Sequence, residues 1–140
     1  MTRFEWAKIQ FHLPRIVLGA VFVFSGLNGF LKFLPDPHYS PEGLSFIQAL
    51  RASGIWWTLL KTAEVVGGSL LLSGSAGRFG VLILAPVTLA IVSFHIFLSP
   101  QGSAMGWGVF ALELFLIVVW RKSLLHIFHH PSRRTQSASR

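Results

Sequence analysis

Four long apolar stretches, separated by short polar segments, dominate the chain. They cover about residues 13–34, 55–72, 79–98 and 106–120. The first three have 22, 18 and 20 residues and the last has 15, against the roughly 20 that an α-helix needs to cross the apolar core of a bilayer. The pattern therefore predicts an all-α integral membrane protein, built as a four-helix bundle.

A shorter element is predicted in the polar segment between the first two spans. Ser40 precedes Pro41, a pair typical of a helix start because serine caps the first turn and proline fits its first position. Apolar residues then recur at the spacing of one helix face, opposite polar ones. We expect a short outer amphipathic helix at about 41–52, lying on the membrane surface.

The spans form one predicted domain, residues 1–122, followed by a basic cytoplasmic tail over residues 123–140. A cleaved signal peptide would also begin with positive charges, but no small-residue cleavage site follows the first span, so we expect it to be retained. In the tail, His126, His129 and His130 have the spacing of a metal-binding helix face. Because apolar residues alternate with them, we interpret them as part of an interfacial helix and assign no metal site.

Composition and charge support a membrane protein and predict its orientation in the bilayer. Only 12% of the residues are charged, against about 25% in soluble domains. The net charge of +7 comes from Lys and Arg near both termini and at the turn around residues 73–78, which predicts a multi-pass protein of the inner membrane with both termini cytoplasmic. Basic termini alone provide neither an element that contacts base edges in a DNA groove nor an aromatic surface on which bases stack. We therefore predict no nucleic-acid partner.

The absence of cysteine narrows the chemistry. With no Cys in the chain, disulfides, thiolate metal sites and covalent haem attachment through Cys are excluded. Any redox chemistry must therefore belong to a bound small molecule or to a partner subunit.

Several polar side chains fall inside the apolar spans, where they are costly and usually face the bundle interior. They are Asn28, Lys32, Lys61, Glu64, His95 and Glu113, with Trp57 at the outer headgroup region. At 1.5 Å of rise per residue, these side chains all fall in the outer half of the membrane. They are the candidate site residues.

Two interpretations of this polar layer are open. Lys61 with Glu64, and Lys32 with Glu113, would be neutralising pairs that hold the helices in register. Alternatively, the titratable His95 together with the two acids lines a pocket for a small molecule or a proton. We expect the pocket to be lined by His95, Glu64 and Glu113.

At these residues the sequence resembles the DoxX family of small membrane proteins, over about residues 15–120. The matching features are Arg15 with LG at 18–19, FSGLNGFLKF at 24–33, AEVVGGSLLLSG at 63–74, Arg78, LAPV at 84–87 and FHIFLSP at 94–100. The resemblance implies a four-helix membrane protein that is often a partner in membrane redox systems. Some relatives are quinone-linked subunits, and more distant ones are assembly factors.

Two function classes follow. The first is a quinone-linked or redox-accessory membrane subunit, because His95, Glu64, Lys61 and Trp57 offer hydrogen-bond donors and protons near the headgroup level. The second is a non-catalytic scaffold or assembly factor. Beyond the lipid bilayer, the expected partners are a membrane redox subunit or a second copy of the chain, and the only candidate cofactor is a quinone. Whether the chain is itself an enzyme stays open.

Overall fold

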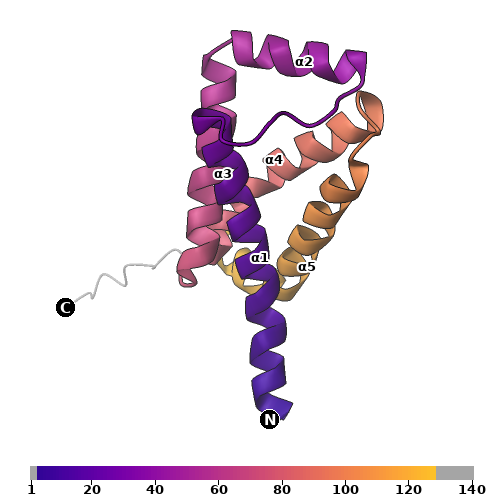
Figure 1. Ribbon diagram of the computed structural model, residues 1–140. Coiled ribbons are helices and arrows are strands. Elements are labelled where there is room, and N and C mark those ends of the chain that lie inside the picture. The colour runs from indigo at the N-terminus through magenta and orange to yellow at the C-terminus, as the bar shows by residue number, and fades with distance from the viewer. Residues whose placement is uncertain (1–2, 129–140) are drawn as a thin grey trace, which may run out of the picture.

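A computed structural model describes residues 3–128, with the side chains of residues 12–127 except that of residue 126. Over this part the elements are all α-helices joined by short linkers, with no strand, which confirms the predicted all-α class. The five helices are α1 (Arg3–Leu31), α2 (Pro41–Ala52), α3 (Ile55–Ser73), α4 (Gly77–Phe97) and α5 (Ser103–Phe128). Figure 1 shows α2 lying across one end of the bundle, with the start of α1 at the other end.

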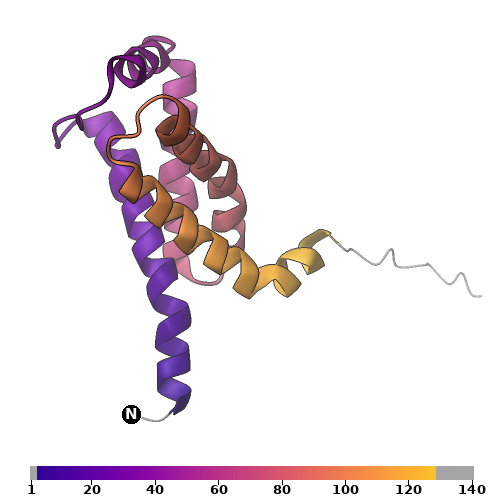
Figure 2. The ribbon, with the colours of Figure 1, turned by 90° about the vertical axis from the view of Figure 1, so that its right-hand side faces the viewer.

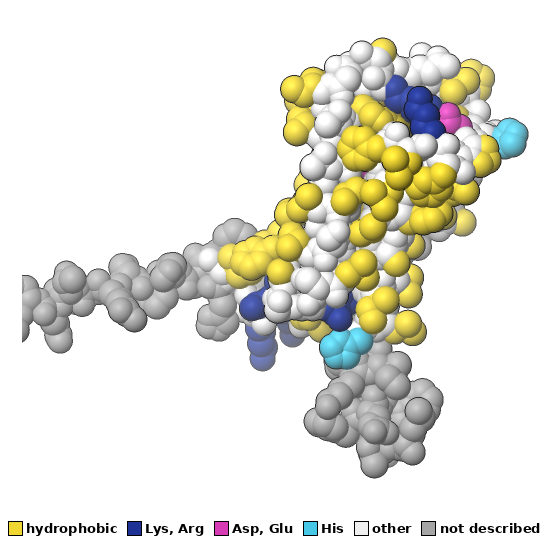
Figure 3. Space-filling model, turned by 60° about the vertical axis from the view of Figure 1, so that its left-hand side comes forward, with side chains coloured by type: hydrophobic (Ala, Val, Ile, Leu, Met, Phe, Trp, Pro, Cys, Tyr) yellow, Lys and Arg dark blue, Asp and Glu magenta, His cyan; other side chains and the backbone are white. Residues whose placement is uncertain are grey.

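Three of the described helices are long and apolar enough to cross a membrane: His12–Leu31, Gly77–Phe97 and Ser103–Leu125. Helix α3 is not among them, because Lys61 and Glu64 lower its apolar character. It nevertheless packs between α1 and α4, so a fourth span stays our prediction. Figure 3 shows a face with apolar side chains over its middle and Lys and Arg at its two ends, as expected of a bilayer-embedded protein.

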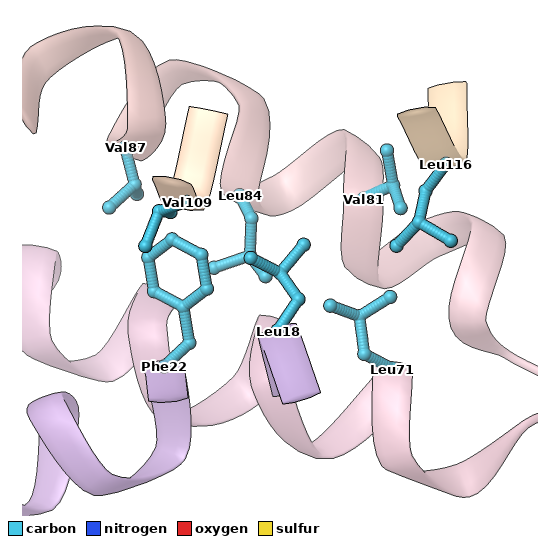
Figure 4. Packing of buried hydrophobic residues seen from close by; sticks show 8 residues of the cluster. All are labelled: Leu18, Phe22, Leu71, Val81, Leu84, Val87, Val109 and Leu116. Carbon is cyan, nitrogen blue, oxygen red and sulfur yellow. The ribbon is translucent and has the colours of Figure 1, made fainter. Parts of the chain in front are cut away.

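The four long helices, α1, α3, α4 and α5, form a ring in which each packs against the next. Helix α3 packs on α1 and α4, and α5 packs on α4 and α1. Their facing sides bury one apolar cluster, shown in Figure 4, of Leu18, Phe22, Leu71, Val81, Leu84, Val87, Val109 and Leu116. Because α3 and α5 stand diagonally across this cluster, side chains on these two helices do not meet merely by lying at the same depth.

Glycines bring the backbones of α1, α3 and α4 close together. A Cβ atom at Gly68 would lie 2.7 Å from the carbonyl oxygen of Gly19, and one at Gly80 would lie 2.6 Å from that of Gly67. Consecutive glycines on α3 thus let this helix approach α1 on one side and α4 on the other, as small residues do in membrane bundles. These glycines serve packing within one chain.

Helix α2 begins where the sequence predicts. The Ser40 hydroxyl oxygen accepts a hydrogen bond from the Gly43 N–H at 3.1 Å, and Pro41 occupies the first helical position. The Ser40 hydroxyl also donates to the carbonyl oxygen of Leu98, and its backbone N–H donates to Ser99 Oγ at 3.2 Å. The start of α2 is therefore attached to the end of α4.

The ends of the first and last helices differ from the expected spans. Helix α1 ends at Leu31 rather than near residue 34, because Lys32 adopts a left-handed backbone conformation with φ of 51°. Helix α5 continues beyond residue 120 to Phe128, and its last turns change direction in Figure 2. His129 and His130 of the predicted interfacial helix lie outside the described residues.

Candidate functional site

A polar pocket of about 280 Å³ lies at the end of the bundle that α2 covers. It is bounded by the last turns of α1, the linker that follows, the end of α2 and the first turns of α3. Its lining residues are Ser25, Asn28, Gly29, Lys32, Leu34, Asp36, Pro37, Tyr39, Arg51, Trp57 and Lys61. We call it the outer pocket. Four of the predicted site residues are among its lining: Asn28, Lys32, Trp57 and Lys61.

An ion pair lies at the inner side of the outer pocket. Lys61 Nζ donates to both carboxylate oxygens of Glu64, at 2.8 and 2.9 Å, and to Ser25 Oγ at 3.5 Å. Glu64 is only 2% exposed. The two residues are three positions apart on α3, so one turn of helix brings them together. The predicted pairing of Glu64 with Lys61 is confirmed.

Trp57 forms an aromatic wall of the outer pocket and lies close to two cations. Its ring centroid lies 5.1 Å from Lys61 Nζ and 4.9 Å from Arg51 Cζ, both within cation–π range. Its indole N–H donates to the Gly29 carbonyl oxygen at 3.1 Å. The indole therefore holds the start of α3 against the end of α1 and orients both cations around the pocket.

The linker is held at the rim by a second ion pair. Arg51 donates from both terminal nitrogens to Asp36, at 2.7 and 2.6 Å. The Arg51 guanidinium lowers the pKa of Asp36, so the carboxylate keeps its charge. Burial raises the pKa of Tyr39, which keeps its phenol a hydrogen-bond donor. These three residues are side chains that the sequence did not single out as site residues.

Two donors of the outer pocket are unused. Asn28 Oδ1 accepts from the Leu34 N–H at 2.8 Å, and because that group can only donate, the amide orientation follows from it. Among the described residues, neither Asn28 Nδ2 nor Lys32 Nζ has a hydrogen-bond partner. The pocket thus offers an amide and an ammonium to an acceptor from outside the chain.

The remaining two candidate residues lie elsewhere, so the structure does not bring His95, Glu64 and Glu113 into one pocket. His95 Nδ1 contacts the Ser99 carbonyl oxygen at 3.0 Å, and its ring lies against Gly106. Glu113 lines a separate cavity between α4 and α5, and the alternative pair of Lys32 with Glu113 is not formed. The expectation rested on the common depth of the three residues and on interior helix faces, whereas α3 and α5 are diagonal in the bundle.

The sequence carried weak signals for the residues it missed. Tyr39 is the only tyrosine of the chain and lies in a polar, proline-rich linker. Its ring packs edge-on against Phe94 at 5.7 Å between centroids, which attaches the linker to α4. The presence of Tyr39 in such a segment suggests an anchor, but which helix it meets depends on the fold.

Comparison with known proteins supports the family. No curated protein and no solved structure is significantly similar to the chain. The family model described as DoxX matches residues 11–96, a shorter stretch than the resemblance over 15–120. It includes every lining residue of the outer pocket and leaves out α5. Because the match spans more than half of the 140 residues, this chain belongs to the DoxX family.

Proposed function

We propose that this integral membrane protein is a redox-accessory subunit that holds the ring of a quinone in the outer pocket. The observation that carries the proposal is the pair of unused donors, Asn28 Nδ2 and Lys32 Nζ, beside an aromatic wall. A quinone ring has two carbonyl oxygens that accept hydrogen bonds and a flat face that stacks on an indole. Membership in the DoxX family supports a role beside a membrane redox system, because the resemblance implies such partners.

The surroundings of the outer pocket suit an amphipathic ligand. Phe30, Leu31 and Phe33 are exposed beside the end of α1, where a lipid-soluble tail would lie. When a partner subunit supplies two electrons, the ring takes up two protons and becomes a quinol. The positive charge of Lys32 and Lys61 would stabilise the negative charge that develops on the oxygens before those protons arrive.

Binding of a short-chain benzoquinone tests the proposal. Lys32→Gln and Asn28→Ala should raise the dissociation constant by about 10-fold to 100-fold, the effect of losing a hydrogen bond to a charged or desolvated donor. The measurement is calorimetric titration of the full chain in mild detergent. Lys122→Gln is the matched control, because it removes an exposed lysine outside the pocket. Absence of saturable binding to the wild type would reject the proposal.

A scaffold or assembly role is the second candidate. It is favoured by the ion pair of Lys61 and Glu64, which satisfies both charges without any ligand. Identification of what copurifies in mild detergent separates the two. A bound quinone supports the redox role, and a stoichiometric membrane protein without quinone supports the scaffold.

We also propose that the outer pocket faces away from the cytoplasm of the cell, with both termini inside and the protein in the inner membrane. The distribution of Lys and Arg along the chain supports this orientation. Reporter fusions at Gly43 and Gly102 should behave as external, and a fusion at Ser75 as internal. The reverse pattern would place the pocket on the cytoplasmic side.

A further inference from the structure

We propose a second ligand site inside the membrane, in the groove between α4 and α5, where Glu113 and Thr88 bind the hydroxyl group of a small ring-containing lipophile that enters from the bilayer. This groove shares no residue with the outer pocket. The site is therefore independent of the proposed quinone binding.

The groove contains two buried polar side chains, one from α4 and one from α5, that approach each other without the geometry of a hydrogen bond. Glu113 is 2% exposed and Thr88 is 1% exposed. Among the described residues, neither Glu113 Oε1 nor Thr88 Oγ1 has a hydrogen-bond partner. Buried polar atoms are nearly always paired in folded proteins, and exceptions call for an explanation such as a missing ligand. Two such atoms in one groove indicate a bound group.

The groove opens toward lipid rather than toward water. Leu89 and Leu114 belong to its lining and are 58% and 48% exposed. Glu113 and Thr88 lie near the middle of the two membrane-length stretches Ser103–Leu125 and Gly77–Phe97. A ligand therefore reaches these two side chains through the apolar core of the bilayer.

The chemistry of the lining restricts the ligand. No Lys, Arg or His is among the lining residues, and an isolated buried charge is costly, so the neutral acid form of Glu113 fits the groove. A neutral carboxyl and a hydroxyl each donate and accept, and an alcohol or phenol hydroxyl can do both in return. The cavity of about 110 Å³, open on one side and lined by Phe110 and Ile117, is of the order that holds one six-membered ring.

A lipid-soluble carbodiimide tests the site in the full-length wild-type protein reconstituted into lipid nanodiscs. The reagent adds to a protonated carboxyl in apolar surroundings and rearranges to a stable N-acylurea without losing a group, so peptide mass spectrometry locates it. We expect labelling at Glu113. Glu64 is the matched control, because it is equally buried but carries an ion pair with Lys61 and should stay unlabelled.

Protection by a ligand then identifies the chemical class. Para-pentylphenol should slow the labelling of Glu113 about 10-fold. Para-pentylanisole, whose oxygen cannot donate a hydrogen bond, should need an about 10-fold higher concentration for the same protection. Leu89→Trp should protect by filling the rim of the groove. Val118→Trp, at an exposed position of α5 outside the lining, should label like the wild type.

Three results would overturn the proposal. The first is an unlabelled Glu113 in protein whose exposed Glu42 reacts with a water-soluble carbodiimide. The second is equal protection by the phenol and the anisole, which means that the groove selects shape and not a hydroxyl. The third is slower labelling of Glu113 at higher ratios of protein to lipid when no phenol is added. That result would identify a second copy of the chain as the occupant of the groove.

Discussion

Glu64→Gln and Lys61→Met should each destabilise the bundle by about 3 to 5 kcal/mol, whereas the double variant should lie near the wild type. Either single change leaves one charge buried without its partner. Lys61 Nζ contacts both oxygens of Glu64, so removing both groups together removes the unpaired charge. Thermal unfolding in detergent, with the four proteins compared as a double-mutant cycle, measures the coupling.

The rim pair of Asp36 and Arg51 is the matched control for this cycle. Its side chains are 49% and 32% exposed, and exposed pairs contribute only about 0 to 1 kcal/mol because water screens them. Asp36→Asn and Arg51→Gln should therefore change stability little. If the effects of Glu64→Gln and Lys61→Met simply add, these two residues are not energetically paired.

Gly80→Ala should destabilise the protein by about 1 to 3 kcal/mol, the usual effect of overpacking, or more. The added methyl group would lie 2.6 Å from the Gly67 carbonyl oxygen and 2.9 Å from the Leu71 nitrogen. Both are backbone atoms of α3, so the helices themselves must separate. Thermal unfolding in detergent again provides the measurement.

Gly108→Ala is the control for Gly80→Ala. Gly108 lies inside α5, and a Cβ atom there would have nothing within 4 Å. The change should leave the bundle intact and favour the helix by about 0.5 to 1 kcal/mol. A Gly80→Ala protein as stable as the Gly108→Ala protein would show that the close approach of α3 and α4 is not required.

Local patterns account for the predictions that the structure confirms. Apolar length decides whether a segment can be a membrane helix, and the caps of α2 depend on Ser40 and Pro41 themselves. The ion pair of Lys61 and Glu64 also follows from local geometry, since residues three apart share a helix face. In each case the interacting groups are close along the chain.

The outer pocket could not be predicted from local patterns, because its lining residues come from segments that are far apart along the chain. It joins the end of α1, a linker, the end of α2 and the start of α3, and the left-handed turn at Lys32 directs the linker over the bundle end. The residues Asp36, Tyr39 and Arg51 belong to it only because of that path. The depth of a residue in the membrane follows from its position along the helix. That depth does not determine which neighbouring helix the side chain faces.

The amino-acid sequence alone therefore established the helices, the membrane and the family, because these depend on hydrophobicity, spacing and local motifs. Only the packing of the helices decided that Glu113 of α5 faces Thr88 of α4 and that His95 lies apart from both Glu64 and Glu113. The physical reason is that the order of helices around the bundle is set by close approach at glycines such as Gly68 and Gly80. These contacts join residues far apart in the chain, and no local pattern specifies which helix each glycine will meet.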